Sequence, residues 1–352
     1  MPQANDLLPP ELDLPPVLNL SRFARAAMLE DAITSLYRWY VARSQENRNW
    51  NPDMSVKWNE YGQNHTEEVH EAVEGFFAVE QYVPDYTTKL LHLVRRSHGR
   101  SHFQLRWGSE EQKHMELWRN AILFGGRRSQ KWVKDYDEGL RGQEWRLPWD
   151  DPLHMLYYTV FQERATQVNY LNLGIIARGE GFSGERDRDP ILEHACRLIA
   201  ADEAAHYHFF LECGRMYLYF FPDRAMEALA NVLRHFAMPA ADIIPNFSQF
   251  SETVMRIGVY GPRSFSRDVA KVALSQLGLE SLRKVEEGIR RSRLIPDIEG
   301  AFRTGAIFET LDYRTVEQKV KQLFSRLKAY NISVGRHEVD PLAEPPWTPE
   351  PA

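Results

Sequence analysis

The sequence of 352 residues lacks several features that would place it in a specialised class of protein. It has only two cysteines, Cys196 and Cys213, so a fold stapled by several disulfides is excluded, and both thiols are expected to be reduced and buried. No apolar run approaches the roughly 18 residues of a membrane span. The net charge of −6 provides no basic field for nucleic acid. The 43% of hydrophobic residues is ordinary for a globular protein, so a large core is expected.

The two ends of the chain are rich in proline and show no helical pattern. The first segment, MPQANDLLPPELDLPP, has neither the basic nor the apolar stretch of a secretory signal. Together with the expected reduced thiols, this indicates a cytoplasmic protein. Residues 1–19 and 336–352 are predicted to be extended, and a single helical domain is expected over residues 20–335.

Between these ends, the apolar and polar alternation of β-strands is almost absent, and apolar residues recur with the period of an α-helix. The expected helices cover residues 20–46, 66–98, 101–125, 128–141, 151–179, 189–219, 222–236, 247–258, 265–278, 280–295 and 313–331. Pro84 should kink the second helix, because proline removes a backbone hydrogen bond. Long helices joined by short loops predict an all-α fold with a bundle at its core and additional helices around it.

Three Glu-x-x-His pairs stand out in this helical pattern. They are Glu67–His70, Glu111–His114 and Glu203–His206. A lone pair carries no information, because random placement in a chain of this composition already produces one. The first pair follows Thr66 in a predicted first helical turn, where acids are favoured anyway, so it is interpreted as structural. The other two lie inside long helices, where residues i and i+3 share a face and can reach one metal ion.

A dinuclear site in a helical bundle also needs one acid from each of two further helices. Glu163 interrupts the otherwise apolar and neutral stretch VFQERATQVNYLNLG, and Glu80 lies among the aromatic residues of EGFFAVEQYVPDY. A charge in such surroundings is costly unless it is paired or binds a metal. The alternative for Glu80 is a solvated face or a salt bridge, for example with Arg164.

Four carboxylates and two imidazoles suit two divalent iron ions, which are the expected cofactor. The six expected ligands are Glu80, Glu111, His114, Glu163, Glu203 and His206. Glu111 and Glu203 are expected to bridge the ions. Glu80 joins His114 on one ion, and the other two ligands complete the second. A reduced centre of this kind has open positions where O2 can bind as the co-substrate.

With these motifs the sequence resembles the soluble acyl-[acyl-carrier-protein] desaturases, the type 2 fatty acid desaturases. EEQKHM and DEAAHY, which hold the two interior Glu-x-x-His pairs, correspond to the family motifs EENRHG and DEKRHE. FQERAT, around Glu163, matches a family motif throughout, and EQYVPDY, which begins with Glu80, matches the family's EEALPTY in part. ENRNWNPD resembles the family's W-x-P segment and places Trp50 in it.

The resemblance implies a ferritin-like four-helix bundle that holds a diiron centre and is usually a homodimer. It implies an O2-dependent desaturase that takes electrons from a ferredoxin-type donor and removes two hydrogens from a saturated acyl chain on acyl carrier protein. The alternative is a diiron oxygenase of the same fold, a hydroxylase or N-oxygenase acting on another carrier-bound or free substrate. A narrow, deep, apolar channel would favour the acyl chain. Iron storage is disfavoured, because the chain is about twice the size of a minimal bundle.

Several departures from the family pattern leave every expected ligand in place. Ala204 and Ala205 replace the usual Lys-Arg, Tyr207 replaces a usual glutamate, and Val79 stands where threonine is common. The insertion GEGFSGERDRD lengthens the connection before the last motif. The first change could alter a surface that meets the acidic carrier protein, and the insertion could alter substrate access.

Thr166 lies three residues after Glu163 and shares its helical face. The resemblance supports a hydroxyl that faces the O2 pocket and assists proton delivery. The alternative is a hydrogen bond to a carbonyl of its own helix. Arg164 is expected to pair with a buried acid. His208 is two residues from His206 and points elsewhere, so it is not expected to be a ligand.

A metal-bound histidine usually donates its other ring N–H to a carboxylate or carbonyl. Asp202 directly precedes Glu203 and projects about 100° away from it around the helix, so it can lie behind the metals. Asp202 is predicted to hold His114. The resemblance adds Trp50 beyond it, in a line that could carry electrons from the donor. The alternative is that Asp202 pairs with an arginine and Trp50 is only a core residue.

Overall fold

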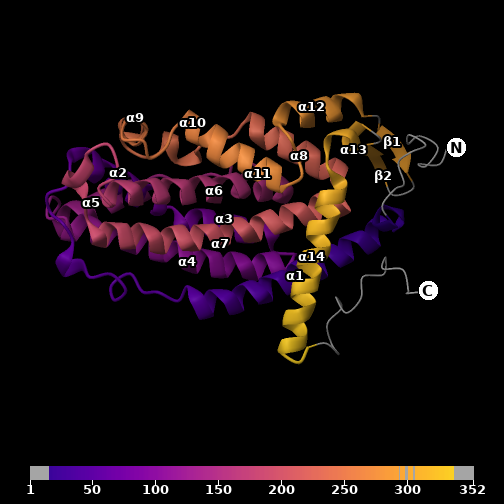
Figure 1. Cartoon of the computed structure of the whole chain (residues 1–352), viewed down its shortest axis with the longest axis horizontal. Coiled ribbons are helices and arrows are strands. Elements are labelled where there is room, and N and C mark those ends of the chain that lie inside the picture. Colours follow the sequence, from indigo (N-terminus) through magenta and orange to yellow (C-terminus); the bar gives the residue numbers. More distant parts are fainter. Residues whose placement is uncertain (1–15, 293, 298–299, 304–305, 337–352) are drawn as a thin grey trace.

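Four helical segments that lie side by side along the long axis of the molecule form the centre of the fold (Figure 1). The first consists of two consecutive helices, and the segments are α2 (Glu67–Glu80) with α3 (Val83–Val94), α4 (His98–Phe124), α6 (Pro152–Ala177) and α7 (Pro190–Phe220). The structure, a computed structural model, describes residues 16–292, 294–297, 300–303 and 306–336. The helical bundle expected from the sequence is confirmed.

Further helices surround this bundle. α1 (Arg22–Asn47) packs against α4 and α7, and α14 (Tyr313–Ser333) crosses α1 and α7 (Figure 1). α8 (Pro222–Arg234) packs on α6, and α9 (Phe247–Arg256) packs on α2. The remaining helices are α5 (Gln130–Arg141), α10 (Pro262–Ser264), the π-helix η6 (Phe265–Ala270), α11 (Lys271–Gln276), α12 (Leu282–Arg291) and α13 (Ala306–Thr310). Short 3-10 helices cover Pro16–Asn19, Trp58–Glu60, Gly184–Asp187 and Pro239–Asp242.

Two of the bundle helices begin with the same local signal, an aspartate followed by a proline. Asp151 accepts hydrogen bonds from backbone N–H groups in the first turn of α6, and Asp189 does the same for α7. Pro152 and Pro190 occupy the first helical position, where the missing N–H has no intrahelical partner to lose. These signals determine where both helices start, and so which of their later residues face the bundle interior.

The second predicted helix, residues 66–98, is not one kinked helix but two. α2 ends at Glu80, and Pro84 lies in the first turn of α3. Proline cannot donate the hydrogen bond that would reach back to the carbonyl of Glu80, so the helix ends there instead of bending. The break leaves Glu80 as the last residue of α2, buried inside the bundle.

The proline-rich ends lie largely outside the described residues. Of the segment 1–19, which was predicted to be extended, residues 16–19 are described, and they form a 3-10 helix. Of the segment 336–352, Arg336 alone is described, and its backbone N–H donates to the carbonyl of Asn331 in α14.

Two predicted helices near the carboxyl end are interrupted. The predicted helix 265–278 begins with a π-helix of six residues. The predicted helix 280–295 stops at Arg291, because Pro296 lacks the N–H that a continuing helix needs. Beyond it β1 (Leu294–Asp297) pairs antiparallel with β2 (Gly300–Arg303), a hairpin that the all-α prediction overlooked.

Two separate apolar cores occupy the bundle, and buried polar residues lie between them. On α4, Phe103 and Trp107 belong to one core, and Leu117 and Trp118 belong to the other. The buried acids and the buried histidine of α4 lie on the turns between these two pairs. On α7 the buried polar residues again lie between members of the two cores, whereas on α6 Glu163 lies among residues of the first core, between Phe161 and Ala165. A polar layer therefore crosses the middle of the bundle. None of the described helices is long and apolar enough to cross a bilayer.

The Glu67–His70 pair lies at the start of α2 and is not among the possible metal ligands in the described part of the chain. Thr66 occupies the N-cap position, as predicted, but its hydroxyl donates to Asp187 instead of capping the helix. Glu67 forms an ion pair with Arg127. Burial and the charge of Arg127 lower the pKa of the half-buried His70 to about 4. These contacts support the structural interpretation of the pair.

Helices α1 and α4 approach each other so closely at Gly99 that a side chain does not fit. A Cβ atom there would lie 2.7 Å from backbone atoms of Ile33 and Thr34 in α1. We expect Gly99→Ala to lower the free energy of unfolding by about 1–3 kcal/mol, because backbone cannot yield as a side-chain tip can. Gly139→Ala is the matched control, because no atom lies within 4 Å and alanine should be neutral or stabilise α5 by up to about 1 kcal/mol. Urea unfolding of both variants checks this, and an unchanged midpoint for Gly99→Ala would contradict the close approach.

The low pKa of His70 leads to a prediction about acid stability. Its pKa is about 4 in the folded protein, whereas histidine in an unfolded chain takes up a proton near pH 6.5. Between these values the unfolded state binds more protons, so the free energy of unfolding falls as the pH falls from about 6.5 to about 4. In His70→Gln this contribution is absent, and the stability of the variant should fall less steeply across that window. Urea midpoints at several pH values check this, and parallel curves for the two proteins would show that His70 titrates normally in the fold.

Candidate metal centre

Six buried side chains from the four helical segments converge in the polar layer. They are Glu80 from α2, Glu111 and His114 from α4, Glu163 from α6, and Glu203 and His206 from α7. Ligand atoms of Glu80, Glu111, His114 and Glu203 all lie within 4.8 Å of one another, and the second such group is Glu111, Glu163, Glu203 and His206. Glu111 and Glu203 belong to both groups, as two bridged ions require. The structure thus brings together all six residues that the sequence predicted as ligands.

The cluster is almost completely buried, since each of the six residues exposes 4% of its surface or less. It contains four carboxylates and two imidazoles, so acid exceeds base. Burial, followed by the charge of Glu111, raises the pKa of Glu80 to about 8. Burial and the charge of Glu203 raise the pKa of Glu163 well above its usual range. Burial also opposes the ionisation of Glu203, but the two neighbouring histidines outweigh burial and lower the pKa of this carboxyl. The raised pKa values therefore reflect burial first and the neighbouring carboxylates second.

Several polar atoms that lie in the cluster make no well-aligned hydrogen bond. Among the described residues they are Nδ1 of His114, Nδ1 of His206 and Oε1 of Glu111, although Nδ1 of His206 lies 2.9 Å from Oε1 of Glu111. Nδ1 of His114 lies 3.5 Å from Oε2 of Glu111 and 3.4 Å from Oε1 of Glu203. Buried polar atoms without partners are costly, and a divalent cation bound by nitrogen and oxygen would satisfy them. The residues present therefore fit a dinuclear metal centre.

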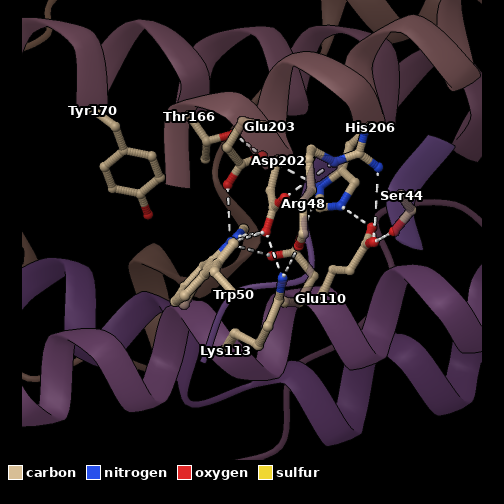
Figure 2. Close-up of polar contacts among 12 residues, drawn as sticks. Ser44, Arg48, Trp50, Glu110, Lys113, Thr166, Tyr170, Asp202, Glu203 and His206 are labelled. Atoms are coloured by element: carbon tan, nitrogen blue, oxygen red, sulfur yellow. Dashed lines mark hydrogen bonds and ion pairs between the residues drawn. The ribbon is translucent and has the colours of Figure 1, made fainter. Parts of the chain in front are cut away.

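Outside the cluster, Asp202 supports His114. Its Oδ2 lies 3.4 Å from Nε2 of His114 and accepts a hydrogen bond of 2.9 Å from the indole N–H of Trp50. The predicted sequence of contacts from His114 through Asp202 to Trp50 is therefore present as geometry. Asp202 also accepts hydrogen bonds from Arg48 at 3.1 Å and from Lys113 at 2.9 Å (Figure 2). The arginine contact that the sequence left open as an alternative exists alongside the line instead of replacing it.

Glu110 supports His206 in the same way, and the sequence analysis missed it. Oε2 of Glu110 lies 3.0 Å from Nε2 of His206, and the hydroxyls of Tyr40 and Ser44 in α1 also donate to this carboxylate. Burial opposes the ionisation of Glu110, but these hydrogen bonds outweigh burial and lower its pKa. The signal was available in the sequence, because an acid directly precedes the glutamate of Glu-x-x-His in both motifs.

Arg48, the residue that follows α1, lies between the two outer carboxylates. Its Nε donates to Asp202, and its Nη2 lies 3.7 Å from Oε1 of Glu110 (Figure 2). Arg106 reaches Glu110 from the other side, with its Nε 3.0 Å from Oε1. α1 therefore supplies no ligand, yet the residues at its end close this side of the polar layer.

Thr166 makes the contact within its own helix that was given as the alternative, and it also contacts a clustered glutamate. Its Oγ1 lies 3.1 Å and 3.0 Å from the carbonyls of Gln162 and Glu163 in its own helix, and 3.0 Å from Oε2 of Glu203. The hydroxyl has one proton, so it donates to one of these oxygens at a time.

Three further side chains lie near the cluster in the sequence or in the structure, and none of them belongs to it. Tyr170 donates a hydrogen bond of 2.6 Å to Oε1 of Glu80, a contact that was missed because a tyrosine in an apolar stretch is usually a core residue. Arg164 does not pair with a buried acid as predicted but donates to the backbone carbonyl of Asp268 in η6, because it projects away from the cluster side of α6. His208 is exposed and contacts its own helix, as expected.

Three cavities that share lining residues pass the cluster. The outer one, of about 530 Å³, lies between α2, α6 and α9 and is lined mainly by apolar side chains. It shares Val79 and Thr166 with a cavity of about 50 Å³, whose wall includes the four clustered glutamates. An inner cavity of about 20 Å³ shares Leu90 and Met155 with the second. These three adjoining cavities, whose walls are mostly apolar, are together called the path.

Comparisons with known proteins agree with this architecture. Residues 51–299 match the family model described as fatty acid desaturase. The chain is 28% identical over 222 residues to stearoyl-[acyl-carrier-protein] 9-desaturase 6 of Arabidopsis thaliana, covering 59% of this chain and 55% of the relative. It is 25% identical over 236 residues to acyl-[acyl-carrier-protein] 6-desaturase of Thunbergia alata, covering 63% and 59%. The matches span little more than half the length of these relatives.

A solved structure has the same helical fold. The X-ray structure of the candidate acyl-ACP desaturase DesA2 from Mycobacterium tuberculosis H37Rv aligns with a TM-score of 0.50 and 18% identity, over 73% of this chain and 99% of that one. At this identity the likeness shows the fold alone. The family model, in contrast, covers more than half of the chain and includes all six clustered residues. This chain therefore belongs to the fatty acid desaturase family.

Proposed function

We propose that this chain is a diiron, O2-dependent desaturase that introduces a double bond into a saturated acyl chain bound to acyl carrier protein. The observation that carries the proposal is the narrow apolar path directly beside the buried carboxylate–histidine cluster. Relatives named as acyl-carrier-protein desaturases support the reaction class. Their names carry different position numbers, so the family leaves the position of the double bond open.

Two iron ions are the proposed cofactor. The ligands would be Glu80, Glu111, His114, Glu163, Glu203 and His206, with Glu111 and Glu203 shared by both ions. When bound, a reduced centre of this kind supplies the activation of O2. The chain itself holds both histidines from behind, through Asp202 and Glu110, and this fixes the orientation of the rings. It also keeps the cluster buried, which strengthens every electrostatic interaction inside it.

The path supports an acyl chain as the substrate. Its walls next to the cluster are aromatic and aliphatic, and they include Trp107, Trp145 and Tyr86. A saturated chain offers no polar group to grip, so its reacting methylene has to be positioned by the shape of the path.

Thr166 is proposed to handle a proton at the edge of the cluster. Its hydroxyl lines both the outer cavity and the cavity beside the glutamates, and it lies within hydrogen-bonding distance of Glu203. The same hydroxyl can turn back to the carbonyl of Gln162. Switching between these oxygens would let Thr166 present or withdraw a proton without moving the backbone.

Electrons are proposed to enter from the opposite side of the cluster. Trp50 lines a polar surface cavity of about 450 Å³ and donates to Asp202, which in turn contacts His114. A ferredoxin-type donor docked over this cavity would be joined to the cluster by consecutive hydrogen bonds. Lys113 lies over the ring of Trp50 at 4.4 Å and is positioned to influence the charge of this route.

The proposal also includes a homodimer located in the cytoplasm. Both cysteines are buried and free, which fits a reducing compartment.

Metal analysis tests the proposed cofactor. We expect about two Fe²⁺ per chain after anaerobic loading, because the two overlapping ligand groups each hold one ion. His206→Ala should weaken binding by at least about tenfold. His208→Ala is the matched control on the same helix and should bind as the unaltered protein does, because its ring is exposed and contacts the carbonyl of Ala204. One ion or none per folded chain would refute the dinuclear site.

Product analysis tests the reaction. Iron-loaded protein with a ferredoxin-type reductant, O2 and a saturated acyl-carrier-protein thioester should release an acyl chain that has lost two hydrogens. Thr166→Val should slow turnover by about a hundredfold if its hydroxyl transfers a proton. Thr159→Val is the matched control, because that hydroxyl donates to carbonyls of its own helix and to no clustered glutamate. A product that has gained an oxygen atom instead would identify the hydroxylase alternative.

A further inference from the structure

The inner cavity, which adjoins the cavity beside the cluster, has three polar side chains on a wall that is otherwise apolar apart from the thiol of Cys213. Two of them are occupied elsewhere. Arg100 donates to the hydroxyl of Tyr217 at 3.1 Å and to the carbonyl of Pro152 at 2.6 Å. Thr159 donates to carbonyls of its own helix. The third polar side chain, Gln104, is therefore the one that can still form a hydrogen bond with an occupant of the cavity.

Gln104 exposes 3% of its surface and lies beside Phe103 on α4. Its Nε2 has no hydrogen-bond partner among the described residues. Most buried amides in proteins are paired, and an unpaired one is costly. An unpaired amide in the wall of the inner cavity is thus a chemical feature that the metal cluster does not require.

The amide distinguishes between possible occupants of the cavity. The cavity measures about 20 Å³, which is room for about one water molecule. Water can pair with the amide, whereas a methyl group that takes its place offers no acceptor. A hydroxyl or ether oxygen of the same size would restore the hydrogen bond.

We infer that Gln104 is a specificity-determining residue that limits the length of the acyl chain beyond the metal cluster. Chains whose methyl end stops short of the amide bind well, and longer chains are rejected unless their end carries a hydrogen-bond acceptor. The inference rests on the proposed function, because it takes the three cavities as the path of the acyl chain. Phe209 and Phe210, which also line the cavity, limit its size, whereas Gln104 determines its polarity.

Binding measurements with acyl chains of graded length test the inference. The full chain, loaded with Fe²⁺ without O2, is titrated with saturated acyl-carrier-protein thioesters that lengthen one carbon at a time. Affinity should rise about fourfold per carbon until the chain reaches Gln104, and then stop rising. In Gln104→Leu the rise should continue for one or two further carbons, so the longest chains bind about tenfold more tightly than to the unaltered protein.

Two further variants show whether a shifted length limit comes from the lost amide of Gln104 or from a general effect of substitution on the fold. Gln104→Met has a side chain of similar length without the amide and should shift the limit in the same direction as leucine. Gln130→Leu changes an exposed glutamine at the start of α5 and should leave the limit unchanged. If either Gln104 variant fails to fold, the other still reports on the inference.

A chain that ends in a hydroxyl is the decisive probe. In this probe a hydroxyl group replaces the terminal methyl of the shortest chain that the unaltered protein rejects, so the length of the chain is unchanged. The unaltered protein should bind the hydroxyl-ended chain more tightly than the methyl-ended one, and Gln104→Leu should reverse that order. The same order in both proteins, or an unshifted length limit in both Gln104 variants, overturns the inference while the proposed function stands. If no acyl thioester of any length binds or reacts, the proposed function fails, and this inference fails with it.

Discussion

Burying six carboxylates in the middle of a helical bundle is the constraint on which the rest of this structure depends. They are Glu80, Glu110, Glu111, Glu163, Asp202 and Glu203, and each exposes 4% of its surface or less. A buried charge without compensation costs far more than any single packing contact returns. The chain compensates the outer pair with Arg48, Lys113 and Arg106, whose side chains reach the two carboxylates from the protein surface. The four inner carboxylates are compensated by only two histidines, so bound cations would have to balance the remaining negative charge.

The fold is arranged so that this layer is stable. Each long helix has apolar residues on both sides of its polar turns, and these build two cores that clamp the layer between them. The break between α2 and α3 places Glu80 at a helix end, where its side chain reaches the other acids. α1 brings Tyr40 and Ser44 to Glu110, so a helix without any ligand still helps to hold the site in place.

The same layer explains why an apolar path can lie next to so much charge. The histidines and outer acids occupy the side that faces α1, and the glutamates face the path. Hydrogen bonds to Glu110 and Asp202 hold polar groups away from the path, so its walls can remain largely aromatic and aliphatic. Charge on one side and hydrocarbon on the other match the proposed acyl substrate, which has no polar handle at the reacting carbon.

The sequence by itself determined the helical fold and nominated the six clustered residues, because the spacing of Glu-x-x-His and the apolar period are local properties of a helix. It also indicated Asp202, whose direction follows from its position beside Glu203. Tertiary structure decided the rest. The contact of Arg48 with Asp202 joins residues 154 apart, and that of Tyr170 with Glu80 joins residues 90 apart. The π-helix and the unpaired amide of Gln104 also depend on what packs around them. Such features arise where distant segments meet, and helical periodicity contains no information about which segments those are.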